Sequence, residues 1–546
     1  MKLSLTRRDA LASGFMGATL LGMPDMLRAQ GALLTSAIDT TAGKVRGRRI
    51  GGVDRFLGIP YGGNTALRRF QPPAPPLQWR GIRDCLALGH QAPQMDLSPA
   101  GFNLDTMPPL VQQVIAAGKQ GMEVGNEGED CLVLNIYTPD ASPRRKRPVM
   151  VWLHGGGFAI GSAGDPQYDG TALARRGDVV VVGINHRLNA LGYLYLGDFS
   201  DDFADSGNVG QLDIVLALQW VRENIANFGG DPANVTIFGE SGGGSKVTVM
   251  LAMPAARGLF HKAIIQSGSG LTMGMKADAV AHAERTLAKL GVAPADVHKL
   301  QAMAYGQVIA AAKAAQQPSQ RVMMPLVDGR LLPGDPFSPA APEVSREVPV
   351  MIGTTRTEAT LFMSADPLFG KMTEAQARQR AMQMLGSKGD AIINYFKSQD
   401  PGSSPSNWAP TYWLAALETA QGTWINAIRL AERKIAQQAA PVFMFRLDWE
   451  APFAGGVLKS PHGLDTDLVF DNPRAKPMMN GTGPDPVKIA AAMSRAWINF
   501  ARTGDPSQAG LVWPAYDTSA RPTMIFNVDS HVMKDPDGPA RVVLNG

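Results

Sequence analysis

The chain has 546 residues, of which 45% are hydrophobic and 18% charged, so it can bury a large core and is typical of a globular protein. Its formal net charge of +4 includes +2 from the first 29 residues, and the near-neutral remainder argues against a nucleic-acid-binding protein. The one basic run, at 144–147, lies between prolines and indicates a solvated turn. No Ser/Gly linker or internal repeat divides the chain, which predicts a single domain.

The first residues are typical of a targeting segment. Thr6-Arg7-Arg8-Asp9 precedes a moderately apolar stretch at 10–23, and the first plausible processing site is near Ala29. Paired arginines before such a stretch resemble a bacterial twin-arginine export signal. We therefore expect a signal peptide at 1–29, a mature single domain at 30–546 without membrane insertion, and a periplasmic or secreted location. The alternative is a basic N-terminal helix that stays attached.

The next elements are two extended patches at 36–60 about the turn Thr41-Ala42-Gly43, which predict a hairpin. Cys85 and Cys131, the two cysteines of the chain, enclose a proline-rich segment that does not suit a simple strand or helix. Export makes a disulfide between them possible, and closing this loop would contribute about 4 kcal/mol in the chain-entropy model. The alternative is two buried free thiols. The enclosed loop suits either a lid over a pocket or a packed surface loop.

Strands are predicted at 131–137 and 148–153, and the second leads directly into His154-Gly155-Gly156-Gly157. Successive glycines after a buried strand leave backbone N–H groups uncovered, as an oxyanion hole requires. Further strands are predicted at 178–185, 235–238, 263–269, 348–354 and 441–447, alternating with helical segments such as 208–228 and an inserted helical region at 277–320. This alternation predicts an α/β fold with a doubly wound, mostly parallel sheet.

The stretch 235–244, VTIFGESGGG, is central to the functional prediction. It combines a strand, a G-x-S-x-G turn and the start of a helix, which is the pattern of a nucleophile elbow. Ser241 would lie at a helix N-terminus, where backbone N–H groups favour a developing anion. A phosphate-binding loop shares the glycine spacing, but it requires lysine after Gly244, where this chain has Ser245.

A nucleophilic serine needs a base and an acid that orients the base. In a fold of this kind they follow in the order serine, acid, histidine. Glu358 is the first carboxylate after the strand at 348–354, and His462 follows the strand at 441–447 more closely than His531 does. The chain order therefore predicts a triad of Ser241, Glu358 and His462.

Several blocks of sequence resemble the type-B carboxylesterase and cholinesterase family. They include FLGIPYG, EDCLVLNIY, HGGGF, NHRLNALGYL, FGGDPANVTIFGESGGG and FARTGDP, and they extend over nearly the whole mature chain. The resemblance implies an α/β-hydrolase fold, Ser241 as nucleophile, His462 as base and Glu358 as its partner. It also implies an oxyanion hole from the N–H groups of Gly156, Gly157 and Gly242, and a disulfide between Cys85 and Cys131.

Two positions depart from the family pattern. Gly242 replaces the usual alanine, which should keep the N–H group but loosen the turn, and Asp465 stands near where many members carry glutamate. Glu240 and Ser267 match family positions that border the site, although a strand-end carboxylate and a turn serine explain them equally well.

The predicted function is hydrolysis of small-molecule carboxylic esters through an acyl-enzyme, without a metal or another cofactor. One alternative is the same triad acting on a lactone, carbamate, amide or polyester; another is a binding protein on the same fold. The segment 319–329 corresponds loosely to the acyl pocket of cholinesterases. It suggests the hypothesis that Arg321 pairs with an anionic acyl group, against the alternative of a surface arginine.

Overall fold

The computed structural model describes residues 33–97, 107–119, 125–399 and 408–545. The expected signal segment at 1–29 lies outside these ranges and stays a prediction. None of the helices in the described ranges combines the length and apolar character needed to cross a membrane.

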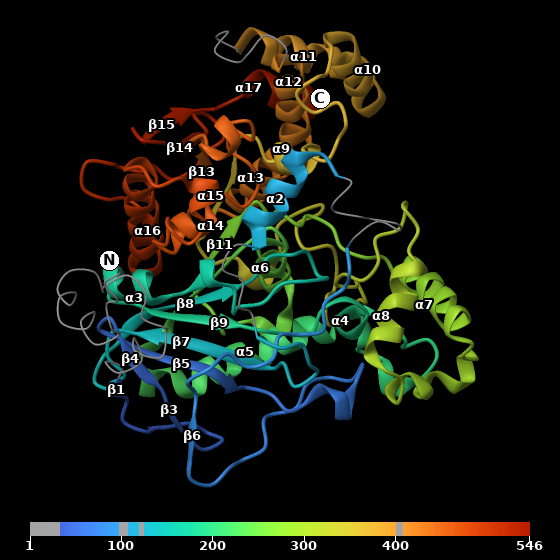
Figure 1. Cartoon of the computed structure of the whole chain (residues 1–546), viewed down its shortest axis with the longest axis vertical. Helices are drawn as coiled ribbons and strands as arrows, with labels where there is room; N and C mark the ends of the chain where they lie inside the picture. The colour runs from blue at the N-terminus through green and yellow to red at the C-terminus, as the bar shows by residue number, and fades with distance from the viewer. Residues whose placement is uncertain (1–32, 98–106, 120–124, 400–407, 546) are drawn as a thin grey trace, which may run out of the picture.

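A twelve-stranded sheet runs through the molecule (Figure 1). In spatial order its strands are β1 (Leu33–Leu34), β4 (Arg48–Ile50), β5 (Val53–Pro60), β7 (Val133–Thr138), β9 (Val180–Ile184), β8 (Arg147–Leu153), β10 (Gly230–Glu240), β11 (Lys262–Gln266), β12 (Val350–Thr355), β13 (Val442–Leu447), β14 (Pro522–Phe526) and β15 (His531–Lys534). Every neighbouring pair from β9 to β14 is parallel, and the outer pairs are antiparallel. This architecture confirms the predicted α/β-hydrolase fold.

Strands β8 and β10 are neighbours, but the chain leaves β8 toward β9 on one side and leaves β10 toward β11 on the other. In open α/β sheets such a switch point creates a crevice beyond the carboxyl ends of the strands. The glycine loop follows β8 and Ser241 follows β10, so the fold brings both to this crevice.

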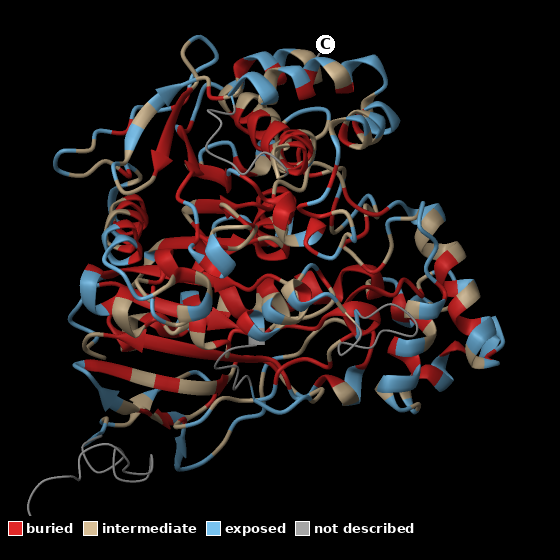
Figure 2. Ribbon diagram, turned by 45° about the horizontal axis from the view of Figure 1, so that its top comes forward, coloured by how far each residue is buried: buried red, intermediate tan, exposed pale blue. Residues whose placement is uncertain are grey.

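Both faces of the central sheet are covered by helices, and the central strands are buried (Figure 2). The helices are α2 (Pro109–Lys119), α3 (Thr171–Gly177), α4 (Asn189–Tyr193), α5 (Val209–Asn224), α6 (Gly242–Ala252), α7 (Lys276–Leu290), α8 (Tyr305–Ala314), α9 (Ala359–Met363), α10 (Glu374–Leu385), α11 (Ser387–Gln399), α12 (Ala409–Thr419), α13 (Ile425–Ile435), α14 (Thr466–Val469), α15 (Pro477–Asn480), α16 (Asp485–Thr503) and α17 (Gly538–Asn545). Strand β8 shows the two-sided burial: Val149 and Val151 belong to the core with α5 and α6, whereas Met150 and Trp152 belong to the core with α3 and α16.

The N-terminal region is more divided than predicted. The expected hairpin about Thr41–Gly43 is present as β2 (Ile38–Asp39) and β3 (Lys44–Arg46), and β3 also pairs with β6 (Ile82–Asp84) in a separate sheet. A second hairpin, β4–β5, turns at Gly51-Gly52 and joins the large sheet. The predicted helical region at 277–320 is confirmed by α7 and α8, which project from one side of the molecule (Figure 1).

The prediction of a disulfide is wrong for this structure, in which Cys85 and Cys131 are free, buried thiols. Strand β5 separates them: the N–H of Leu57 donates to the carbonyl of Cys85 on one side, and Pro60 pairs with Val133 on the other. Chains on opposite sides of one strand are about 10 Å apart, which is two interstrand spacings. A disulfide requires Cα atoms within about 7 Å. The prediction rested on two cysteines in an exported chain and on the family resemblance, neither of which contains the order of the strands.

The segment between the cysteines contains the eleven-residue helix α2, although its prolines argued against a helix. The helix begins at Pro109, where the missing N–H of proline has no intrahelical partner to lose. Val114, Ala117 and Gly118 of this helix line the cleft that contains Ser241, so this part of the segment covers a pocket.

Candidate active site

Ser241 occupies a tight turn between β10 and α6. Its backbone has φ 57° and ψ −123°, a conformation that costs a non-glycine residue about 1–3 kcal/mol. Its amide donates to the carbonyl of Gln266 at 2.9 Å, which ties the turn to the end of β11. A Cβ at Gly243 would lie 1.9 Å from the carbonyl oxygen of Leu153, so no larger residue fits there. This is the strand–turn–helix geometry that exposes a nucleophilic hydroxyl.

Glu358 and His462 are in direct contact, although 104 residues separate them in sequence. Oε2 of Glu358 is hydrogen-bonded to Nδ1 of His462. The Glu358 side chain is almost completely buried, and that of His462 is 13% exposed. Oε1 of Glu358 accepts from the amide of Thr355 at 2.7 Å and from the hydroxyl of Ser267 at 2.6 Å. The carboxylate therefore has partners for both oxygens and can fix the orientation of the imidazole.

The second nitrogen of the imidazole faces a further carboxylate. Nε2 of His462 lies 3.3 Å from Oε1 of Glu240, the residue directly before Ser241. Among the described residues, the Ser241 hydroxyl has no hydrogen bond to His462. The structure thus brings Glu358 and His462 together, with Ser241 in the same cleft but not hydrogen-bonded to the base.

Electrostatics at His462 favour its protonated form. Burial alone would lower the pKa of His462, but the carboxylates of Glu240 and Glu358 outweigh burial and raise it. Burial, reinforced by the negative charge of Glu358, raises the pKa of Glu240 to about 7. Burial, reinforced by the charges of Glu240 and Glu358, raises the pKa of Asp465 to about 8. Within the described ranges, the Asp465 carboxyl accepts one hydrogen bond, from Nε2 of Gln266 at 2.9 Å. Three buried carboxyls therefore surround one imidazole.

A hydrogen-bonded clasp joins the loops that carry the acid and the base. The Thr357 hydroxyl donates to the carbonyl of Ser460 and accepts from the amide of Ser460, both at 2.9 Å. The Ser460 hydroxyl in turn donates to the carbonyl of Leu447 at the end of β13. The clasp fixes the loop after β12 against the loop after β13, one residue from Glu358 and two from His462.

The glycine loop after β8 packs directly on the start of α6. The N–H groups of Gly156, Gly157 and Gly242 donate to no acceptor among the described residues. A Cβ at Gly242 would lie 2.2 Å from the carbonyl oxygen of Gly157. Glycine at this position therefore permits close contact with the loop, which is a different role from the expected loosening of the turn.

The cleft that contains Ser241 and His462 has a volume of about 530 Å³. Most of its wall is apolar, with Leu97, Val114, Leu361, Phe362 and Met479 among the lining residues. The ring of Phe362 is 65% exposed and lies over His462, with the ring centroids 5.1 Å apart. A cleft of this size and character suits a drug-sized apolar ligand.

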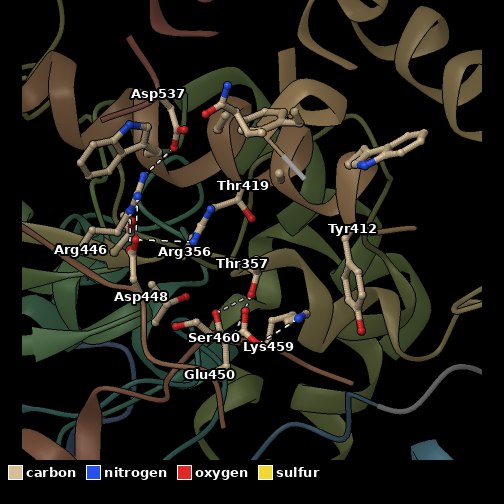
Figure 3. A pocket seen from close by; sticks show the side chains of 18 of the residues that line it. Arg356, Thr357, Tyr412, Thr419, Arg446, Asp448, Glu450, Lys459, Ser460 and Asp537 are labelled. Carbon is tan, nitrogen blue, oxygen red and sulfur yellow. Dashed lines mark hydrogen bonds and ion pairs between the residues drawn. The ribbon is translucent and has the colours of Figure 1, made fainter. Parts of the chain in front are cut away.

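A second cavity of about 400 Å³ lies behind the clasp (Figure 3). Thr357 and Ser460 line it from one side. On another side, Arg446 is buried between Asp448 and Asp537 and pairs with both carboxylates. The loops that carry Glu358 and His462 therefore have one face toward the cleft that contains Ser241 and the other toward this cavity.

Comparison with known proteins identifies the family of this chain. Residues 35–540 match the model of the carboxylesterase family. The para-nitrobenzyl esterase of Bacillus subtilis is 34% identical over 515 residues, which cover 92% of this chain and 97% of that protein. The chain belongs to the carboxylesterase family. It is accordingly a carboxylic ester hydrolase with an α/β-hydrolase fold.

Solved structures of other esterases resemble this carboxylesterase along most of its length. The carboxylesterase Est55 of Geobacillus stearothermophilus is 36% identical and has a TM-score of 0.77, covering 93% of this chain and 100% of its own. An esterase of Clostridium hathewayi, described as hydrolysing aliphatic aromatic polyesters, is 30% identical with a TM-score of 0.78 and covers 94% of this chain and 98% of its own.

The structure separates Arg321 from the cleft of this carboxylesterase. Its guanidinium donates to the Thr272 hydroxyl and the Met273 carbonyl, and the residue is exposed and absent from the cleft wall. Glu240 and Ser267, which sequence reasoning left out of the site, contact His462 and Glu358 directly. Their position at strand ends beside the elbow was the available signal.

Proposed function

We propose that this carboxylesterase hydrolyses esters with a Ser241–His462–Glu358 triad and an acyl-enzyme intermediate. The observation that supports it best is the contact between His462 and Glu358 in the cleft where the strained turn exposes Ser241. In ligand-free proteins the hydrogen bond between nucleophile and base is often long and tightens when substrate binds. We expect substrate binding to exchange Glu240 for the Ser241 hydroxyl as the partner of Nε2.

In the first half-reaction, Oγ of Ser241 attacks the ester carbonyl carbon while Nε2 of His462 accepts the hydroxyl proton. The carbonyl oxygen becomes an oxyanion, which the N–H groups of Gly156, Gly157 and Gly242 stabilise. The carbon–oxygen bond to the alcohol then breaks, and the leaving alkoxide takes the proton from His462. Glu358 stays ionised and stabilises the imidazolium that forms between these steps.

In the second half-reaction, water attacks the acyl-enzyme carbonyl and gives a proton to His462. Collapse of the second tetrahedral intermediate releases the carboxylic acid and returns the proton to Ser241. The apolar cleft wall favours uncharged acyl and alcohol groups. A panel of p-nitrophenyl esters graded in acyl length and charge, together with a lactone, a carbamate, an amide and a polyester, would identify the bond and the substrate class.

The nucleophile assignment is tested by Ser241→Ala. We expect hydrolysis of p-nitrophenyl butyrate to fall by about 10⁴-fold or more, because loss of a nucleophile removes the covalent route. Ser245→Ala, one helical turn away, is the matched control and should keep wild-type activity. A fluorophosphonate should label the wild type and Ser245→Ala but not Ser241→Ala. Labelling of Ser241→Ala, or retention of most of its activity, would show that the nucleophile is another residue.

A further inference from the structure

Lys246, on α6 one turn beyond Ser241, is a buried cation without a counterion. Its side chain is fully buried, and no carboxylate lies within ion-pair distance of it among the described residues. Its ammonium donates one hydrogen bond, to the carbonyl oxygen of His154 at 2.8 Å, and lies 5.9 Å from the ring centroid of Phe158. Burial lowers the pKa of Lys246 to about 7. A group this costly to bury is unusual unless it has a function.

The partner of Lys246 is the residue that begins the glycine loop. His154 directly precedes Gly155, Gly156 and Gly157, and its carbonyl belongs to the peptide group that leads into the loop. The loop and the start of α6 otherwise meet through glycine backbones, as the contact between Gly157 and Gly242 shows. Backbone contacts of this kind do not lock the loop in one orientation, whereas a hydrogen bond to a carbonyl fixes the plane of its peptide group.

We propose that Lys246 is a positioning residue that anchors the glycine loop to the nucleophile helix, so that the N–H groups of Gly156, Gly157 and Gly242 converge on one point. This inference rests on the proposed function, because that point is where the oxyanion forms. Lys246 does not touch the substrate. It acts through the His154–Gly155 peptide group, and its loss moves donors that stabilise the transition state more than the ground state.

The surroundings of Lys246 agree with an anchoring role. The rings of His154 and His186 stack with centroids 4.9 Å apart, and Nε2 of each is buried without a partner in the part of the chain that the structure describes. Burial lowers the pKa of both histidines, and the charge of Lys246 lowers each further. Both rings therefore stay neutral, and the donor to the His154 carbonyl is the ammonium of Lys246.

The test replaces the donor and keeps the shape. Lys246→Met should lower kcat for p-nitrophenyl butyrate by about 10- to 100-fold and leave KM within about 3-fold of wild type, because a small misplacement of transition-state donors costs this much. The affinity for a boronic acid that forms a tetrahedral adduct with Ser241 should fall by the same factor as kcat/KM. The thermal unfolding midpoint should stay the same or rise, because a buried unpaired cation is removed.

Lys434 provides the matched control. It is also fully buried and donates to the carbonyls of Ser345 and Arg346 at 2.7 and 2.6 Å, near the amino end of β12 and so at the opposite edge of the sheet from the site. Lys434→Met should leave kcat, KM and boronate affinity unchanged. If Lys246→Met keeps kcat within 2-fold of wild type, or if Lys434→Met lowers kcat equally, the proposal is wrong.

A second variant decides the matter if Lys246→Met does not fold. In Lys246→Gln, the donor nitrogen is one atom closer to the backbone than in lysine. We therefore expect a kcat between that of Lys246→Met and that of the wild type, with KM unchanged. Wild-type kcat in a folded Lys246→Gln protein would overturn the anchoring role. The proposed function would still stand if the wild-type protein hydrolyses esters and the Ser241→Ala variant does not. An inactive wild type would overturn both.

Discussion

At the scale of single residues, the imidazole of His462 is held between two carboxylates. Glu358 contacts Nδ1 and Glu240 faces Nε2, and both raise the pKa of His462. A general base works only when neutral, so the acidic limb of the activity profile should lie above the ordinary histidine pKa of about 6.5. Glu240 thereby favours the charged form of the imidazole.

Glu240→Gln should move this limb to lower pH. Removing a negative charge beside Nε2 lowers the pKa of His462, so the base stays neutral, and the enzyme active, in more acidic solution. The measurement is kcat/KM against pH for p-nitrophenyl butyrate. Glu418→Gln is the control, because burial also raises the pKa of Glu418 but that residue lies on α12, outside the cleft wall. A limb that stays in place or moves upward in Glu240→Gln would contradict this electrostatic account.

At the scale of elements, the proposed triad depends on two loops at neighbouring strand ends. Strands β12 and β13 are parallel and in register, so their carboxyl ends deliver Glu358 and His462 to the same level. The Thr357–Ser460 clasp then fixes the two loops together at the wall of the second cavity (Figure 3). Acid and base are thus oriented by backbone pairing first and by one hydroxyl second.

Thr357→Val should weaken this arrangement. The variant keeps the shape but removes the two hydrogen bonds of the clasp and a longer one from the Thr357 hydroxyl to the carbonyl of Leu458 at 3.4 Å. It also leaves the buried Ser460 amide unpaired, at a cost of about 1–3 kcal/mol in the free energy of unfolding. We expect a lower unfolding midpoint in denaturant and a several-fold lower kcat.

Thr354→Val is the matched control for the clasp. Thr354 is also buried in β12, but its hydroxyl has no hydrogen-bond partner among the described residues. The control should leave kcat unchanged and stability unchanged or increased. Equal losses of stability and kcat in the two variants would show that the clasp has no special role.

At the scale of the whole molecule, one large sheet with two apolar faces provides the framework without a covalent link. The cores on its two faces include helices from both halves of the chain, so distant segments are held by packing. Burial raises the pKa of Cys85 to about 12 and that of Cys131 still further, which keeps both thiols protonated and unreactive.

Reduction should therefore leave stability unchanged. We expect the thermal unfolding midpoint to shift by less than about 1 °C with a reducing agent, because no loop-closing bond is lost. Thiol titration in guanidinium chloride, without reductant, should detect both cysteines, and the native protein should react slowly. A denatured protein without free thiols, and an unfolding midpoint that falls on reduction, would support the disulfide that the sequence resemblance implied.

The sequence by itself determined the elements whose chemistry is local. A buried strand, glycines that alone fit a tight turn, and a serine between them specify the elbow at Ser241, and chain order then led to Glu358 and His462. Only the tertiary structure decided what depends on strand order and on packing between distant segments. It separated Cys85 from Cys131 by one strand, removed Arg321 from the cleft, and placed Glu240 on Nε2 and Lys246 on the His154 carbonyl. The physical reason is that backbone preferences act over a few residues, whereas such contacts are fixed by how the sheet and its helices pack.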